Sequence, residues 1–180
     1  MDSDRDQPAP EPLRTAEARR PGLSGGGDLL GLVGFLGLCF AVSGIGGAIT
    51  ATSVGTWYQA LSKPAFNPPD WLFAPVWTLL YLCMAVAGWR IWRRLGWRAG
   101  RTPLLVFGLQ LLLNLGWSWL FFGQRLIGAA LAEMLALLGA ILATAVLFWR
   151  RDRLAGLLFV PYAGWVGYAL LLNAALWRLN

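Results

Sequence analysis

Aromatic and amide side chains recur at helical spacing in three segments that are otherwise apolar. The first segment carries Trp77 and Tyr81, four residues apart. The second and third carry longer stripes, which comprise Gln110, Asn114, Trp117 and Phe121, and then Tyr162, Trp165, Ala169 and Asn173. Spacings of three and four residues place each set on one face of a helix. Aromatic walls with a few amides suit a flat apolar ligand. The alternative is that the amides only hydrogen-bond between helices and fix a bundle.

The groups that ordinary catalysis and metal binding require are missing from the sequence. It contains no histidine, and its two cysteines, Cys39 and Cys83, both lie inside apolar runs. We therefore expect no metal site and no histidine-ligated haem, and we interpret the cysteines as small packing residues rather than as a disulfide. A nucleophile–base pair and a glycine-rich phosphate loop are missing as well.

Glu133 is the one carboxylate inside an apolar run. An ionisable residue within a membrane span is a functional candidate. No histidine, lysine or second acid accompanies it in that run, so a proton relay is not supported. Two interpretations stay open, namely a functional carboxylate and an acid that is hydrogen-bonded at a helix-packing face.

The elements that must position these residues are long and almost free of charge. Only 13% of the chain is charged and 57% is hydrophobic, whereas soluble domains carry about 25% charged residues. About 20 apolar residues cross a hydrocarbon core of roughly 30 Å, and these runs are apolar on all sides, unlike the helices of a soluble bundle. The sequence predicts an all-α integral membrane protein in which residues 29–180 form a bundle of five transmembrane helices. We expect these helices at about 29–51, 71–92, 102–123, 126–149 and 154–177.

Two stretches that are not part of the predicted membrane helices flank the first apolar run. Residues 1–28 are rich in proline, glycine and charged side chains, so we expect a disordered tail there. The first extramembrane loop, between the first two helices, is rich in tryptophan and proline from Trp57 to Trp71. Because Pro64 and the Pro68-Pro69 pair do not fit an ordinary helix interior, we expect this loop to pack as a lid over the bundle, where the three stripes converge.

The basic residues are distributed unevenly between the two sides of the predicted bundle. Twelve of the fifteen lie on the side of the N-terminus, which predicts a cytoplasmic N-terminus and an external C-terminus. The net charge of +6 does not indicate nucleic-acid binding, because the arginines lie at helix ends rather than along one face. A protein regulator that binds the arginine-rich side and the tail is one alternative for the function. Small residues in the first and fourth helices favour close packing within the bundle over the alternative of a homodimer face.

The order and spacing of these motifs resemble the translocator protein / tryptophan-rich sensory protein (TspO/MBR) family over residues 30–180. The motifs that carry the resemblance are Trp57-Tyr58-x-x-Leu61-x-Lys63-Pro64-x-x-x-Pro68-Pro69, Trp71-x-Phe73-x-Pro75-x-Trp77-x-x-x-Tyr81, Gln110-x-x-x-Asn114-x-x-Trp117, Val160-Pro161-Tyr162-x-x-Trp165, and Asn173 with Leu179-Asn180. Several spaced motifs in one order are far more specific than any one of them. The polar tail is an addition to this pattern.

The resemblance implies a five-helix bundle, often a homodimer, with a ligand pocket under the first loop. The strong preference for arginine over lysine is typical of a GC-rich bacterium, so we expect the bundle in a bacterial cell membrane. It implies a receptor or transporter that binds porphyrins such as protoporphyrin IX, as ligands rather than as cofactors, and in animal relatives also cholesterol. The basic residue that the animal sterol motif needs close after a tyrosine is missing after Tyr168, and this departure argues against sterol recognition. The expected ligand-binding residues are Trp57, Tyr58, Lys63, Trp77, Tyr81, Asn114, Trp117, Tyr162, Trp165 and Asn173.

An alternative function also follows from the resemblance. Some bacterial relatives degrade protoporphyrin IX in a light-dependent way, and the two tryptophans tied to that chemistry match Trp77 and Trp165. The residues alone favour a protein that is not an enzyme and identify no firm catalytic group. Lys63, the single lysine, either meets a propionate of the ligand or pairs with Asp70.

Overall fold

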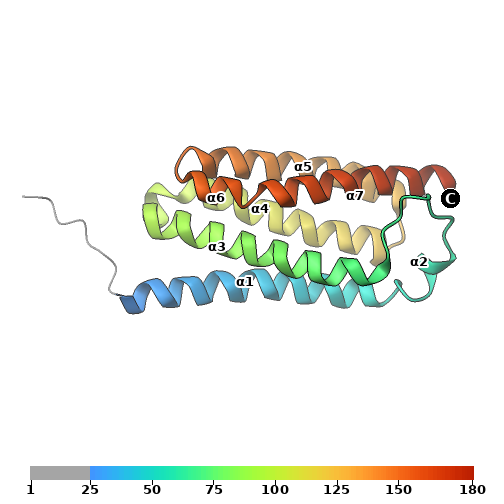
Figure 1. Cartoon of the computed structure of the whole chain (residues 1–180), viewed down its shortest axis with the longest axis horizontal. Helices are drawn as coiled ribbons and strands as arrows, with labels where there is room; N and C mark the ends of the chain where they lie inside the picture. The colour runs from blue at the N-terminus through green and yellow to red at the C-terminus, as the bar shows by residue number, and fades with distance from the viewer. Residues whose placement is uncertain (1–24) are drawn as a thin grey trace, which may run out of the picture.

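The structure is a computed structural model, and it describes residues 25–180. This part of the chain is all-helical, and its long helices lie lengthwise side by side (Figure 1). Five of its helical segments have the length and apolar composition needed to cross a bilayer, as the sequence predicts. The long helices are α1 (Gly25–Ala51), α3 (Phe73–Ala99), α4 (Arg101–Ser118), α5 (Ile127–Trp149) and α7 (Val160–Leu179). The short ones are α2 (Trp57–Ala60), η1 (Asp70–Leu72), η2 (Trp119–Gly123) and α6 (Arg153–Leu157).

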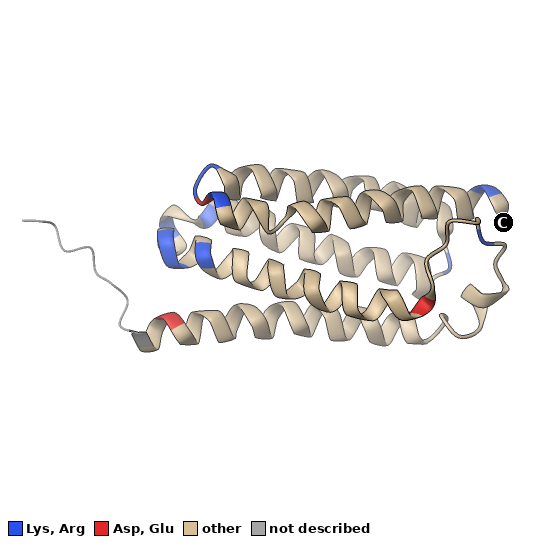
Figure 2. Cartoon of the chain, viewed as in Figure 1, with Lys and Arg blue, Asp and Glu red and all other residues tan. Residues whose placement is uncertain are grey.

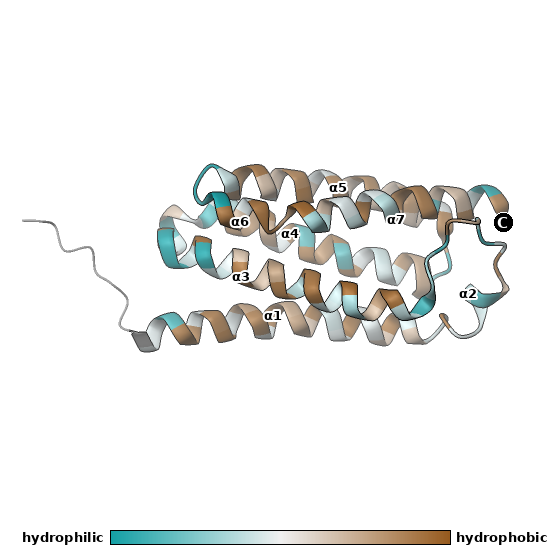
Figure 3. Ribbon diagram, in the orientation of Figure 1, coloured by the Kyte–Doolittle hydropathy of each residue, from teal (hydrophilic) through white to brown (hydrophobic). Residues whose placement is uncertain are grey.

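The helices pack in a chain of neighbours around an aromatic core. α1 packs on α3 and α4, and α5 packs on α4, α6 and α7. Phe107, Phe148, Phe159 and Tyr162 are fully or almost fully buried in the middle of this core. Apolar residues also cover the outer faces of the helices along most of their length (Figure 3). A surface of this kind fits hydrocarbon rather than water.

With the exception of Glu133 in α5, the charged residues of the described chain gather at the two ends of the bundle (Figure 2). At one end, arginines lie in the turns between α3 and α4 and between α5 and α6; this is the arginine end. At the other, the first loop (residues 52–69) lies beside the C-terminus; this is the loop end (Figure 1). Cys39 and Cys83 lie within the bundle as free thiols, as expected from their apolar surroundings.

The first helix starts earlier than the predicted residue 29. α1 begins at Gly25, and Asp28 lies in its first turn, where a negative charge stabilises the helix by its interaction with the helix dipole. The Asp28 carboxylate lies 3.2 Å from Arg93 Nε, and the Asp28 carbonyl accepts a hydrogen bond from Trp89 Nε1 at 3.0 Å. These contacts with α3 order the last residues of the stretch expected to be a tail. The rest of the expected 1–28 tail, up to residue 24, lies outside the described residues.

The second predicted helix ends at 92, whereas α3 continues to Ala99. The end of the apolar run does not end the helix, because Arg94 and Leu95 are good helix formers outside the membrane as well. Gly96 adopts a left-handed φ of 66°, which glycine tolerates, and this kink turns the chain toward α4. Gly100 then packs so closely on the Gly96 carbonyl that a Cβ atom would lie 2.5 Å from its oxygen.

The third and fifth predicted helices are each interrupted. The segment predicted at 154–177 is split into α6 and α7, because Pro161 lacks an N–H group and its ring displaces the carbonyl four residues earlier. The segment predicted at 102–123 changes from α-helix to the π-helical turn η2, closed by a 2.8 Å hydrogen bond from Gln124 N to the Trp119 carbonyl. Ser53 of the first loop donates to the Phe122 carbonyl at 2.7 Å, so η2 also anchors that loop.

Asp152 joins three elements at the arginine end. Its Oδ1 accepts hydrogen bonds from the backbone N–H groups of Leu154 (3.0 Å) and Ala155 (3.2 Å) and caps α6. Its Oδ2 lies 2.9 Å from Arg90 Nη2 and 3.6 Å from Arg94 Nη1, both on α3. Burial raises the pKa of this carboxyl, but the hydrogen bonds from Ala155 and Arg90 outweigh it, so the pKa lies below its ordinary value of 3.8.

We predict that Asp152→Ala lowers the free energy of unfolding by about 2 kcal/mol at pH 7, because it removes a helix cap and leaves two arginines unpaired. Asp152→Asn keeps a capping oxygen and costs less than the alanine variant. The pKa of Asp152 is lower in the folded chain than in the unfolded chain, so its ionised pair stabilises the fold above about pH 4. This stabilisation is lost as the pH falls through the pKa of Asp152 in the folded chain. Unfolding curves in detergent at pH 7 and pH 3 measure this. An equal cost of Asp152→Asn at both pH values would contradict the ion pair.

Candidate functional site

The first loop packs against the bundle end through its aromatic residues. Tyr58 is buried, and its ring centroid lies 6.2 Å from that of Phe121 and 5.8 Å from that of Phe122. Trp57 packs edge-on against Phe121 at 5.5 Å. Burial, followed by the charges of Asp70 and Tyr168, raises the pKa of Tyr58 to about 12. The hydroxyl therefore stays protonated at neutral pH and donates to Asn67 Oδ1 at 2.8 Å.

Tyr168 of α7 and Asn180, which follows the end of α7, hold the loop in place. The Asn180 side-chain amide pairs with the backbone of Ser62, since its Oδ1 accepts from Ser62 N at 2.9 Å and its Nδ2 donates to the Ser62 carbonyl at 3.1 Å. Tyr168 Oη donates a hydrogen bond to the Phe66 carbonyl. The loop thus lies as a strap across the end of α7, with main-chain groups of its middle residues satisfied by side chains.

A buried chain of hydrogen bonds crosses the core at the level of Tyr81. Tyr81 Oη on α3 donates to Asn114 Oδ1 on α4 at 2.5 Å, and Asn114 Nδ2 donates to Tyr162 Oη on α7 at 2.9 Å. All three residues are buried. Trp77 covers the two tyrosines, with ring-centroid distances of 5.7 Å to Tyr81 and 6.2 Å to Tyr162. Hydrocarbon offers no partner for these groups, so the chain ties three helices together.

The other two membrane amides differ from each other. Asn173 Oδ1 accepts a hydrogen bond from Trp117 Nε1 at 3.3 Å, and Asn173 Nδ2 donates to the Ile127 carbonyl at 2.9 Å. Asn173, like Asn114, therefore links helices. Gln110 is fully buried, and neither atom of its amide has a hydrogen-bond partner among residues 25–180. Glu133 lies against Gly116 at the α4–α5 contact, and its carboxyl likewise finds no partner within the described chain.

An open groove with a volume of ≈ 430 Å³ lies between α3 and α7 at the loop end. Trp165 and Tyr168 supply its aromatic wall, with ring centroids 5.9 Å apart, and Phe73 packs on the edge of Trp165 at 5.9 Å. Leu79, Pro161 and Gly164 are exposed, so the mouth opens on the lateral surface of the bundle. The complete lining is Pro68, Leu72, Val76, Leu79, Leu80, Pro161, Gly164, Trp165 and Tyr168.

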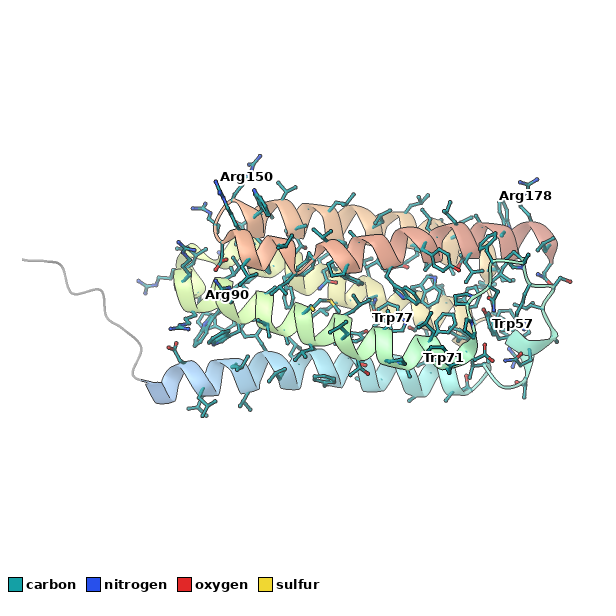
Figure 4. The ribbon with its side chains drawn as sticks, viewed as in Figure 1. Trp57, Trp71, Trp77, Arg90, Arg150 and Arg178 are labelled. Carbon is teal, nitrogen blue, oxygen red and sulfur yellow. The ribbon has the colours of Figure 1, made fainter. Side chains whose placement is uncertain are left out.

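The structure divides the predicted site residues among three places. The hydrogen-bonded core consists of Tyr81, Asn114 and Tyr162, and Trp77 packs on its two tyrosine rings. Trp165 lines the groove. The remaining four aromatic and amide residues pack at the loop end around Phe121: Trp57, Tyr58, Trp117 and Asn173. Figure 4 shows the labelled Trp77, which lies near the start of α3, and Trp57 and Trp71 near the first loop. Side chains of one predicted pocket thus fill each other's space, and the open volume lies beside them.

The sequence prediction did not include most of the residues that line this groove. Pro161, Gly164 and Tyr168 lie on the same face of α7 as Trp165, and their helical spacing would have identified them. Lys63 does not pair with Asp70 as one interpretation held. Its Nζ lies 4.9 Å from the Tyr58 ring centroid and donates to the Gln59 carbonyl at 3.2 Å, while the Gln59 amide donates to Asp70 at 2.8 Å.

We predict that Asn114→Leu lowers the free energy of unfolding by about 1–3 kcal/mol, because it leaves two buried hydroxyl groups without a partner. In a Tyr81→Phe/Tyr162→Phe background the same substitution should cost clearly less, since no hydroxyl is then orphaned. Equilibrium unfolding of the four proteins in one detergent gives the coupling energy. A cost of Asn114→Leu that is the same in both backgrounds would show that the hydrogen-bonded chain does not stabilise the fold.

Comparison with known proteins agrees with this architecture. A model of the TspO/MBR family matches residues 35–178. The chain is 40% identical over 155 residues to the tryptophan-rich protein TspO of Chlorobaculum tepidum, which covers 85% of this chain and 98% of that protein. It is 38% identical over 126 residues to the human translocator protein, with 69% and 75% covered, and 36% identical over 146 residues to the tryptophan-rich sensory protein of Cereibacter sphaeroides, with 81% and 89% covered. The chain therefore belongs to the TspO/MBR family and is an integral, multi-pass membrane protein.

Proposed function

We propose that this protein binds tetrapyrroles, with protoporphyrin IX as the test ligand, in the groove between α3 and α7. The observation that carries the proposal is the coincidence of an open apolar groove of ≈ 430 Å³ with the exposed faces of Trp165 and Tyr168. Small-molecule sites have volumes of about 300–1,000 Å³ and are lined mainly by apolar and aromatic groups. A flat macrocycle is matched to such walls because aromatic rings stack or meet edge-to-face. Family membership supports a receptor or sensor role at the membrane, and two relatives are named translocator and sensory proteins.

Lys63 is the group that we propose for the acidic part of the ligand. It lies in the strap that also contributes Pro68 to the groove. Among residues 25–180 its ammonium group contacts only uncharged partners, the Gln59 oxygens and the Tyr58 ring. A propionate would offer it a charge-assisted hydrogen bond, which is stronger than a neutral one. The packed residues do not line the groove and would act indirectly, because they fix the position of α7 relative to α3. They are Trp77, Tyr81 and Tyr162.

We also propose that the arginine end of the bundle faces the cytoplasm and that the protein forms a homodimer. The excess of arginine at the arginine end supports a cytoplasmic location of that end, which cysteine-labelling from either side of sealed vesicles tests. The exposed glycines of α1, such as Gly34, Gly37 and Gly44, have open space at their Cβ positions and support a homodimer. Sedimentation in density-matched detergent tests the oligomeric state.

We predict that Gly164→Leu weakens protoporphyrin IX binding at least tenfold, since roughly four added heavy atoms would occupy the groove. The site around Gly164 has open space, so the fold should be unaffected. Trp165→Phe should weaken binding by roughly three- to tenfold through the loss of aromatic contact. Titration followed by the Soret band measures both.

Two matched controls make this test specific. Gly139→Leu adds the same side chain on the exposed face of α5, and Trp71→Phe removes an indole that is 72% exposed and outside the groove. Both controls should bind as the wild type does. If Gly164→Leu and Trp165→Phe also retain full affinity, the ligand does not bind in this groove.

Light-dependent degradation of the bound porphyrin is a second candidate function. The observation that favours it is the placement of Trp165 on the groove wall with Trp77 packed on Tyr81 and Tyr162 behind it, since all of these rings are oxidisable. We predict that illumination of the complex in air bleaches the Soret band of the bound porphyrin. At equal ligand occupancy, the rate of this bleaching should be at least tenfold lower in Trp77→Phe/Trp165→Phe. Bleaching at the same rate in that variant, or in detergent without protein, would leave binding alone as the function.

A further inference from the structure

Five arginines at the arginine end are without partners in the described chain. Arg90 and Arg94 pair with Asp152, and Arg93 pairs with Asp28, so within residues 25–180 the two acids of this end already have partners. The other arginines are exposed and form neither an ion pair nor a side-chain hydrogen bond within residues 25–180. They are Arg98, Arg101, Arg150, Arg151 and Arg153.

These arginines come from two turns of similar composition. We use the word turn here for residues 97–101, which include the end of α3 and the start of α4, and for residues 149–153, which include the end of α5 and the start of α6. Each starts with a tryptophan that is largely exposed, Trp97 at 66% and Trp149 at 49%. Because α4 packs on α5 in antiparallel fashion, Arg101 at the start of α4 and Arg150 just after α5 lie at the same end of one helix pair.

Both tryptophans are held in place by close packing. The Trp97 ring lies 6.2 Å from that of Trp92, which in turn packs directly on the Gly31 backbone. Trp149 packs on Gly156 so closely that a Cβ atom there would lie 2.7 Å from the Trp149 backbone nitrogen. The Trp97 ring and the Trp149 main chain are therefore fixed at this end of the bundle, and indoles settle where hydrocarbon meets the headgroups.

Apolar side chains continue from the arginines toward the middle of the bundle. One turn from Arg101, Leu105 of α4 is 62% exposed, and one turn before Arg150, Val146 of α5 is 50% exposed. The surface thus combines cations at the level of the headgroups with a lipid-facing apolar strip directly below them. A free phosphate or a soluble acidic protein would use only the first of these features, whereas a phospholipid uses both.

We propose that the two turns form a binding surface for anionic phospholipid, with its phosphate groups on the arginines and its acyl chains along α4 and α5. Guanidinium groups donate paired hydrogen bonds to phosphate oxygens. Each arginine near an anionic membrane surface changes a binding constant by roughly fivefold. The surface lies at the end of the bundle opposite to the groove, so it does not depend on the proposed tetrapyrrole binding.

The test compares phosphatidylglycerol and phosphatidylcholine with identical acyl chains, added to the full chain in neutral detergent micelles. We expect phosphatidylglycerol to raise the thermal midpoint at concentrations at least tenfold lower than phosphatidylcholine. In Arg101→Gln/Arg150→Gln this preference should fall at least tenfold. The matched control is Arg125→Gln/Arg178→Gln, which removes the same charge from exposed arginines at the loop end and should keep the preference.

Three results would overturn the proposal. The first is an equal response of the wild type to both lipids. The second is a preference that survives in Arg101→Gln/Arg150→Gln or is lost equally in the control variant, which would mean that the two turns hold no special surface. The third is equal protection by inorganic phosphate at millimolar concentration without added lipid, which would identify a free anion as the ligand.

Discussion

The arrangement of this bundle depends on the pairing of Asn114 with two tyrosines in a medium that offers no other partner. Tyr81, Asn114 and Tyr162 come from three helices, and each satisfies a polar group of its neighbour. Their pairing fixes the rotation of α3, α4 and α7 about their own axes, because any other rotation would leave polar atoms in hydrocarbon. The faces that remain for other uses follow from this rotation, and one of them is the surface of α7 that carries Trp165.

The loop end adds a second constraint to this core. The strap of residues 52–69 is held at its main chain by Asn180 and Tyr168, and at the Ser53 side chain by the Phe122 carbonyl of the π-helical turn η2. Tyr168 serves both the strap and the groove wall, so the roof and the wall share one residue. Widening of the last turn of α4 into a π-helix also places Phe121 and Phe122 under Tyr58. π-helical turns of this kind recur near functional sites.

The five spanning helices could be predicted because length and apolarity alone decide them. Their ends could not, because α3 continues past the apolar run to a kink at Gly96, and α1 starts early through contacts of Asp28 with α3. The stripes correctly indicated inward faces, yet spacing on one helix does not tell which helix it meets. Asn114 was expected to line a pocket or to link helices, and only the arrangement of α3 and α7 on either side of α4 places Tyr81 and Tyr162 around it. The groove itself depends on the separation of α3 and α7 at the loop end, and the residue pattern of one helix does not predict the distance between two helices.

Because the mouth of the groove is lateral, the concentration that governs its occupancy by a solute is the concentration in the lipid phase. Leu79, Pro161 and Gly164 open toward the surface that hydrocarbon covers, while the strap covers the end that faces water. A solute reaching this mouth is already dissolved in the lipid phase, so its relevant concentration is its mole fraction among the acyl chains. Diluting the protein with more lipid at constant total solute would therefore empty the groove, even when the aqueous concentration hardly changes.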